Sequence, residues 1–361
     1  GEIGGVTSHS AIIARALGIP CILGVKDAAS IIKSGDELVA DAVKGEIIIS
    51  PSADEKAEYS LLKEQEQNER LMLKEYINKP TVTKSGLKKA VYANIAKAED
   101  VHGAVVNGAE GIGLFRTEFL YMDRNQAPGE DEQFEAYSSV AKAMGGREVI
   151  IRTLDVGGDK HIPYLEIEKE ENPFMGLRAI RYCLKNTELF KVQLRALLRA
   201  ACYGNIKIML PLVCTEDEVI KAKSLLEECK AELSAEGKEY KKDIKLGIMV
   251  ETPAAVLVAE RLAAVSDFFS IGTNDLTGYT MAADRGNNEV SYLYNSNDPA
   301  VLKAIEITVK SAKRANIPVG MCGEAAADPK MIPRLIDWGL DEFSVSSSRI
   351  LKTRKLICDC E

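Results

Sequence analysis

The sequence has little histidine, no long apolar run and no excess of basic residues. Its formal net charge of −8 argues against nucleic-acid binding, which normally relies on a basic surface. No apolar stretch approaches the ~20 residues of a membrane-spanning helix, and the first residues lack the charged-then-apolar pattern of a secretory signal. We therefore expect a cytoplasmic protein whose partners include neither nucleic acid nor membrane. Any anionic ligand must meet locally placed arginines.

Paired cysteine motifs are also missing. The cysteines form no repeated Cys-x-x-Cys pairs, although there are eight of them, at positions 21, 183, 202, 214, 229, 322, 358 and 360. That spacing indicates neither a zinc site nor a disulfide framework. We expect most of them to be reduced core residues.

The length and composition are those of a protein with a large buried core. The chain has 361 residues, of which 46% are hydrophobic and 28% charged, enough for two domains or for one large barrel with an appendage. Three regions are expected, at 1–52, 53–80 and 81–361. The first combines a helix with two short strands, at 37–42 and 46–49, as part of a small α/β unit. In the second, residues 53–78 contain neither Gly nor Pro and predict a long, exposed connector helix.

Beyond Pro80, apolar β-rich runs alternate regularly with helical stretches. Eight such runs are expected strands: 90–96, 111–117, 149–154, 206–213, 246–250, 268–272, 317–322 and 342–345. Near-continuous apolar strands are typical of a parallel sheet buried on both faces, and roughly 250 residues is the usual size of a (β/α)8 barrel. The expected fold class is therefore α/β, a TIM barrel preceded by a small α/β unit and a helical linker. A doubly wound open sheet is the competitor, but polar residues cluster at the C-terminal ends of the strands, which favours the barrel.

One histidine, His9, lies in a glycine-rich loop at the start of an apolar helix. Gly4 and Gly5 permit unusual backbone conformations, and Thr7 or Ser8 can cap the helix. Backbone N–H groups and the helix dipole favour an anion at such a helix start, so a phosphoryl group on the imidazole would be stabilised there. A capping loop with an incidental histidine is the alternative.

Three arginines are expected at the barrel mouth. Arg116 ends the second predicted strand, Arg152 lies in the third, and Arg285 lies in the long loop after the sixth. Guanidinium groups grip phosphate and carboxylate oxygens two at a time, so this set predicts a compact, multiply charged anion.

Two carboxylates and a thiol are also expected at the C-terminal ends of predicted strands. Glu251 follows the fifth strand, Asp275 follows the sixth, and Cys322 ends the seventh. The carboxylates indicate a hard divalent cation, because Mg²⁺ takes one or two carboxylates together with substrate oxygens. A structural salt bridge inside the barrel explains any one such residue equally well, but it does not explain agreement at five strand ends. Together these groups predict phosphoryl transfer from a small phosphorylated acid.

Several long segments resemble the phosphoenolpyruvate-protein phosphotransferase family, enzyme I of the bacterial sugar phosphotransferase system. The resemblance runs in order from Gly1 to about Leu356 and includes Gly-Gly-Val-Thr-Ser-His-Ser-Ala, Gly-Leu-Phe-Arg-Thr-Glu-Phe, Asn-Pro-Phe-Met-Gly-Leu-Arg, Val-Glu-Thr-Pro-Ala-Ala, Ser-Ile-Gly-Thr-Asn-Asp-Leu-Thr and Gly-Met-Cys-Gly-Glu. It implies a barrel that binds phosphoenolpyruvate and forms a homodimer. It also implies that His9 receives the phosphoryl group, passes it to the histidine-containing phosphocarrier protein, and leaves pyruvate as the product.

The resemblance assigns roles to matching positions. Arg116, Arg152 and Arg285 would hold the phosphate of phosphoenolpyruvate. Arg178 and Asn274 would complete the grip on the substrate. Glu251 and Asp275 would bind Mg²⁺, and Cys322 would protonate the enolate at its methylene carbon.

The sequence also departs from this family. The family's phosphohistidine domain lies largely before the histidine loop and carries a helical subdomain that docks the phosphocarrier protein, and its barrel continues beyond Leu356. We expect a chain truncated at the N-terminus and slightly at the C-terminus, which binds phosphoenolpyruvate and Mg²⁺ but phosphorylates the carrier inefficiently. Two alternatives stay open: pyruvate phosphate dikinase or phosphoenolpyruvate synthase, with a nucleotide as acceptor, and a non-catalytic module that senses phosphoenolpyruvate or dimerises.

Overall fold

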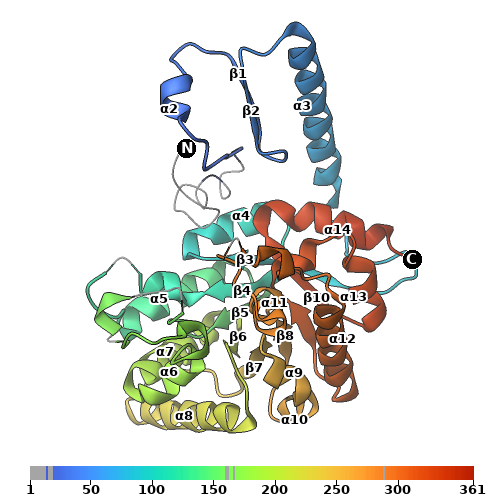
Figure 1. Cartoon of the computed structure of the whole chain (residues 1–361). Helices are drawn as coiled ribbons and strands as arrows, with labels where there is room; N and C mark the ends of the chain where they lie inside the picture. Colours follow the sequence, from blue (N-terminus) through green and yellow to red (C-terminus); the bar gives the residue numbers. More distant parts are fainter. Residues whose placement is uncertain (1–13, 15–18, 123, 159–161, 166, 288) are drawn as a thin grey trace. The chain divides into compact units, whose positions relative to one another are not determined.

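The computed structural model describes residues 14, 19–122, 124–158, 162–165, 167–287 and 289–361. The chain divides into two compact units, Gly1–Glu75 and Tyr76–Glu361, each of which is considered by itself (Figure 1). None of the helices in these described ranges combines the length and apolarity that crossing a bilayer requires.

The first unit contains a hairpin of two short antiparallel strands, β1 (Leu38–Asp41) and β2 (Glu46–Ile49), preceded by the short helix α2 (Ala28–Ile31). The Asp41 carboxylate shapes the turn by accepting the N–H groups of Val43 and Lys44 at 2.9 and 3.0 Å. Gly45 completes the turn with a φ of +73°, a conformation that costs glycine little. The two strands expected around this turn are confirmed.

The connector helix α3 spans Ala53–Leu73 and continues as a 3-10 helix over Lys74–Tyr76. Its start is held by a capping box, in which the Glu55 N–H donates to the Ser52 hydroxyl while the Glu55 carboxylate accepts the Ser52 N–H at 2.7 Å. None of its side chains is buried. The expected exposed helix is thus present, although regular α-helix ends at Leu73, short of residue 78.

The second unit is built around a closed barrel of eight parallel strands (Figure 1). The strands are β3 (Ala90–Ile95), β4 (Gly111–Arg116), β5 (Glu148–Arg152), β6 (Asn205–Leu210), β7 (Lys245–Val250), β8 (Phe269–Ile271), β9 (Val319–Met321) and β10 (Glu342–Ser346). The sheet closes because β10 pairs in parallel with both β9 and β3. The predicted TIM barrel is confirmed, and the doubly wound open sheet is excluded.

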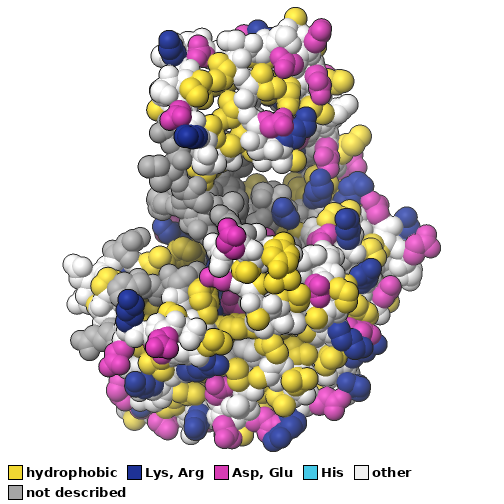
Figure 2. Space-filling view, viewed as in Figure 1, with side chains coloured by type: hydrophobic (Ala, Val, Ile, Leu, Met, Phe, Trp, Pro, Cys, Tyr) yellow, Lys and Arg dark blue, Asp and Glu magenta, His cyan; other side chains and the backbone are white. Residues whose placement is uncertain are grey.

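Helices surround the barrel and shield the outer faces of its strands (Figure 1). The α-helices are α4 (Val101–Val106), α5 (Glu130–Ala143), α6 (Ile180–Lys185), α7 (Thr187–Ala200), α8 (Glu216–Ala235), α9 (Pro253–Leu257), α10 (Ala259–Ala264), α11 (Thr273–Met281), α12 (Pro299–Arg314), α13 (Ile332–Trp338) and α14 (Ile350–Asp359). Lys, Arg, Asp and Glu side chains are intermixed on the visible face of the barrel unit, without a large patch of one sign (Figure 2).

The core has two layers because the strands are buried on both faces. Val149 and Ile151 of β5 belong to the large cluster between sheet and helices, while Ile150 belongs to a small cluster with Leu114, Met209, Met249, Phe268 and Cys322. Alternate residues of one strand therefore enter different clusters, so the residues on both faces of the strand must be apolar. This explains the near-continuous apolar runs of the sequence.

A buried carboxyl group lies at the start of β10. A Cβ on Gly113 would lie 2.1 Å from Oε1 of Glu342, so this position on β4 has room only for glycine. That Oε1 has no hydrogen-bond partner among the described residues. Burial, followed by the negative charges of Glu148 and Asp341, raises the pKa of Glu342 to about 8, while the opposing charge of Lys207 lowers it.

Candidate active site

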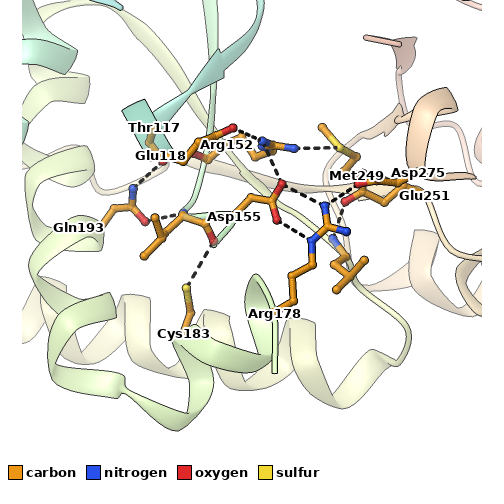
Figure 3. Close-up of polar contacts among 12 residues, drawn as sticks. Thr117, Glu118, Arg152, Asp155, Arg178, Cys183, Gln193, Met249, Glu251 and Asp275 are labelled. Atoms are coloured by element: carbon orange, nitrogen blue, oxygen red, sulfur yellow. Dashed lines mark hydrogen bonds and ion pairs between the residues drawn. The ribbon is translucent and has the colours of Figure 1, made fainter. Parts of the chain in front are cut away.

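The structure brings most of the predicted site residues to one end of the barrel. Figure 3 shows Arg152, Arg178, Glu251 and Asp275 there. Arg116 is the last residue of β4 and Arg152 the last of β5. Glu251 follows β7, Asp275 lies in the first turn of α11 after β8, and Cys322 follows β9. The C-terminal ends of parallel strands in a closed barrel meet at a single mouth, so these side chains share it. His9 lies outside the described residues.

Arg152 is buried and held between two carboxylates. Its Nη2 donates to Oε1 of Glu118 at 2.8 Å and lies 3.1 Å from Oδ2 of Asp155. Burial alone would lower the pKa of Arg152, but Glu118 and Asp155 raise it overall. Its Nε is buried without a hydrogen-bond partner among the described residues. Arg152 is therefore a permanent cation with one donor left over.

Arg178 reaches the mouth from the loop before α6. Its Nε donates to Oδ1 of Asp155 at 3.1 Å, its Nη2 to Oδ2 of Asp275 at 2.7 Å, and its Nη1 to the Tyr279 hydroxyl at 3.2 Å. The next residue, Ala179, has a φ of +53°, which an L residue rarely adopts without cost. Asp155 thus joins Arg152 and Arg178 in one chain of ion pairs (Figure 3).

Arg116 is the one of these arginines whose positive charge is disfavoured by its surroundings. Burial lowers the pKa of Arg116; Glu118 opposes that shift, and the positive charge of Arg152 adds to it. Its Nε, like that of Arg152, is buried without a partner in the described part of the chain. The guanidinium lies over the ring of Phe119, 5.1 Å from the centroid. Two neighbouring cations with unused donors form a site that an anion would stabilise.

Glu251 is fixed by the backbone of the neighbouring β6–α8 loop. The Leu212 N–H donates to Oε1 of Glu251 at 2.7 Å, and Leu212 itself has a φ of +56°. A Cβ on Gly272 would lie 2.7 Å from the other carboxylate oxygen, so a larger residue there would displace the Glu251 carboxylate. Burial, followed by the negative charge of Asp275, raises the pKa of Glu251 to about 8.

These two carboxylates fit a magnesium ion that draws its remaining ligands from substrate and water. The negative charge of Asp275 disfavours ionisation of Glu251, a conflict that a divalent cation would remove. The described residues contain no group of three or more His, Cys, Asp or Glu side chains able to enclose a metal. Mg²⁺ does not need one, since one or two carboxylates and substrate oxygens suffice. The Arg178 guanidinium pairs with one oxygen of Asp275.

Cys322 is a protonated thiol in the barrel interior. Burial raises the pKa of Cys322 to about 12; the nearby Ser270 hydroxyl opposes the shift, and the charge of Glu251 adds to it. The thiol donates to the Ile271 carbonyl at 3.8 Å. A thiol that keeps its proton at neutral pH is suited to act as an acid.

Asn274 and Arg285 lie at the edge of this group. Oδ1 of Asn274 accepts the Glu324 N–H at 3.4 Å, and its backbone carbonyl accepts the Tyr294 hydroxyl at 2.8 Å. Burial raises the pKa of Tyr294 to about 12, and the positive charge of Arg285 opposes this. Arg285 itself is exposed on the loop after α11, so the structure does not bring it into the buried cluster.

Sequence reasoning missed the residues that hold the arginines. Glu118, Asp155 and Tyr279 received no role, although the structure places each against Arg152 or Arg178. A usable signal existed for two of them, since Glu118 follows Arg116 by two residues and Asp155 follows Arg152 by three. An arginine at a buried strand end requires a nearby counter-charge.

Comparison with known proteins agrees with this geometry. The family described as PEP-utilising enzyme, PEP-binding domain, matches residues 71–361, and the PEP-utilising enzyme mobile domain matches residues 2–45. The chain belongs to the PEP-utilising enzymes.

Curated relatives are similar over nearly the whole chain. Proteins named phosphoenolpyruvate-protein phosphotransferase from Bacillus sp. (strain S) and Geobacillus stearothermophilus are 50% identical over 353 residues, or 98% of this chain and 61% of theirs. The one from Bacillus subtilis (strain 168) is 49% identical over 360 residues, 99% of this chain and 62% of its own. The chain thus spans about three fifths of the length of these relatives. Among solved structures, an HpcH/Hpal aldolase/citrate lyase family protein from Burkholderia cenocepacia J2315 covers 79% of this chain and 96% of its own, at 16% identity and a TM-score of 0.45.

Proposed function

We propose that the barrel binds phosphoenolpyruvate at its C-terminal mouth and that His9 receives the phosphoryl group, which then passes to the histidine-containing phosphocarrier protein of a sugar phosphotransferase system. The names of the relatives, which are about half identical to this chain, support a protein acceptor over a nucleotide.

The observation that carries the proposal is a pair of guanidiniums whose Nε atoms are buried and have no partner among the described residues. Arg116 and Arg152 each have an unpartnered Nε in the described structure, and the two positive charges disfavour one another. A phosphate dianion would accept both donors and neutralise the repulsion. We assign Arg116 and Arg152 to the phosphate, with Arg285 closing over it from its exposed loop. Arg178 and Asn274 complete the contacts to the substrate.

The transfer needs positioning and charge neutralisation more than covalent help from the barrel. The bond between phosphorus and the enol oxygen breaks as a bond from phosphorus to the His9 imidazole forms, leaving the enolate of pyruvate. The Cys322 thiol then gives its proton to the methylene carbon, and pyruvate results. Glu251 and Asp275 would hold Mg²⁺, which supplies positive charge to the phosphate oxygens when bound.

The proposal assigns a role to each expected region. Residues 1–52 carry the phosphorylated histidine, 53–80 form the linker, and 81–361 form the phosphoenolpyruvate-binding barrel. The matched ranges of the mobile and PEP-binding domain families support this division. We further propose a homodimer formed through the barrel and a cytoplasmic location, as the sequence resemblance implies.

Intact-mass and peptide mass spectrometry test the function directly. The chain is incubated with phosphoenolpyruvate and Mg²⁺, and we expect an acid-labile phosphate on His9. His9→Ala should abolish the modification, whereas His102→Ala, at an exposed histidine of α4, should leave it unchanged.

A parallel incubation with adenine nucleotides separates the alternatives. Phosphate on His9 without any nucleotide supports the proposed reaction. Modification that requires a nucleotide would instead indicate a dikinase or synthase. Tight binding of phosphoenolpyruvate with no phosphohistidine under either condition would indicate the sensing module.

A further inference from the structure

A buried glutamine on α7 holds the backbone at the ends of two neighbouring barrel strands. Gln193 is fully buried, and the structure gives its amide three hydrogen bonds. Its oxygen accepts the Leu154 N–H at 2.9 Å, and its nitrogen donates to the Thr117 and Tyr137 hydroxyls, each at 3.1 Å. Leu154 lies just beyond β5, and Thr117 just beyond β4. One side chain thus binds the two strand ends that carry Arg152 and Arg116 (Figure 3).

Thr117 extends this connection to Arg152 itself. The Thr117 hydroxyl accepts from Gln193 and donates to the Arg152 carbonyl at 2.8 Å. Each hydroxyl therefore donates in one direction. Thr117 donates to the backbone of β5, and Tyr137 donates to the Gln133 amide oxygen at 2.9 Å. Both N–H groups of the Gln193 amide are used, one by the Thr117 hydroxyl and one by the Tyr137 hydroxyl.

Side chains have to satisfy the backbone groups here because the hydrogen bonds between β5 and its neighbouring strands end at this point. The Thr153 N–H still donates to the Met209 carbonyl of β6. At Leu154, Gln193 takes the N–H, and the Cys183 thiol of α6 donates to the carbonyl at 3.7 Å. Buried backbone groups beyond a sheet need such partners. The following residue is Asp155, which holds both Arg152 and Arg178.

We propose that Gln193 is a positioning residue for the Arg116–Arg152 pair and acts on it through Thr117 and Leu154. The inference rests on the proposed function, since the arginine pair is taken to bind phosphate. Arg116 and Arg152 disfavour each other, so without an anion their separation depends on the backbone that carries them. The Gln193 amide sets that separation before substrate arrives and so reduces the cost of binding it.

The test compares two substitutions of the same chemistry at the same depth. Gln193→Met removes the amide from the strand ends. Gln133→Met removes the other buried amide of this network, whose partners are the hydroxyls of Tyr121 and Tyr137 and the Pro128 carbonyl. Titration calorimetry with phosphoenolpyruvate and Mg²⁺ should show a Kd raised about tenfold or more for Gln193→Met, as expected for loss of a positioning hydrogen bond. For Gln133→Met, it should stay within about twofold of the unsubstituted chain.

Thr117→Val tests the route of the effect. It should raise the Kd by less than Gln193→Met does, because the bond from the Leu154 N–H to Gln193 remains, and the double variant should lose little more than Gln193→Met alone. Additive losses, or an unchanged Kd in Gln193→Met with the fold intact by thermal unfolding, would overturn the proposal.

Hydrogen–deuterium exchange of the ligand-free chain provides a readout that is independent of phosphoenolpyruvate. We expect faster exchange of the 152–155 backbone in Gln193→Met and unchanged exchange there in Gln133→Met. If the unsubstituted chain fails to bind phosphoenolpyruvate, the proposed function fails, while exchange still decides whether Gln193 holds these strand ends. Equal protection of 152–155 in all variants would refute that role.

Discussion

Replacing Arg116 with methionine should affect binding and stability in opposite directions. Arg116→Met removes a guanidinium whose Nε is buried and unpartnered and whose charge opposes that of Arg152. Leaving such a donor unsatisfied costs about 1–3 kcal/mol. The contact with the Phe119 ring, which the substitution also removes, stabilises by about 0.5–1 kcal/mol. The difference leaves a net gain of about 1 kcal/mol, or roughly 2 °C in unfolding temperature for a unit of this size.

Binding of phosphoenolpyruvate should fall steeply in the same variant. A charge-assisted hydrogen bond to a phosphate contributes about 1.5–3 kcal/mol, so loss of the Arg116 Nε donor raises the Kd by about tenfold or more. Titration calorimetry with Mg²⁺ measures the affinity, and differential scanning calorimetry without ligand measures the stability.

Arg354 on α14 is the matched control. It is buried, but its guanidinium donates to the Thr81 hydroxyl at 3.0 Å and to the carbonyls of Ile77 and Gly108 at 2.8 and 2.6 Å. Gly108 lies before β4, at the barrel end opposite the mouth. Arg354→Met should therefore destabilise the unit by about 3 kcal/mol or more and leave the affinity for phosphoenolpyruvate unchanged. If Arg116→Met behaved in the same way, losing stability and keeping its affinity, the assignment of Arg116 to the substrate would be wrong.

Three further outcomes are expected. Cys322→Ala should slow pyruvate formation by about 100-fold or more while Mg²⁺-dependent binding of phosphoenolpyruvate persists. Weaker binding in this variant would show that the assignment of Cys322 as a proton donor alone is wrong. Removing Mg²⁺ with a chelator should weaken phosphoenolpyruvate binding in the unsubstituted chain but not further in Glu251→Gln, and an additional loss there would locate the ion elsewhere. Burial raises the pKa of Glu342 from about 4.3 to about 8, so the unfolded chain releases this proton first, and stability falls by about 1.4 kcal/mol per pH unit across that interval. Urea unfolding followed at Trp338 should lose this slope in Glu342→Gln, and a slope equal to that of the unsubstituted chain would show that Glu342 stays ionised.

The end of the barrel at which each strand-end residue lies could be predicted from the sequence. Arg116, Arg152 and Cys322 close apolar runs, and the ends of parallel strands meet at one mouth whatever the rotamers are. The sequence therefore predicted the shared position of these groups without any side-chain coordinate. Arg285 shows the limit of this reasoning, because a residue in a long loop is not placed by strand order, and it is exposed in the structure.

The counter-charges could not be predicted in the same way. Arg178 pairs with Asp275, which is 97 positions away in the sequence, and nothing in either local segment indicates this contact. Gln193 gives no signal in the sequence, since a polar residue within an amphipathic helix normally faces water. Its burial depends on how α7 packs against the ends of β4 and β5.

The sequence by itself determined the barrel and the strand ends at which its polar groups lie, because near-continuous apolar runs and the polar residues that close them are local properties of the chain. Only the tertiary structure decided which of those groups neutralise one another and which keep unused donors. Ion pairs and hydrogen bonds depend on distances of about 3 Å between residues remote in sequence, and folding alone sets such distances. The unpartnered Nε atoms of Arg116 and Arg152, on which the proposed phosphate site rests, become visible only at that level.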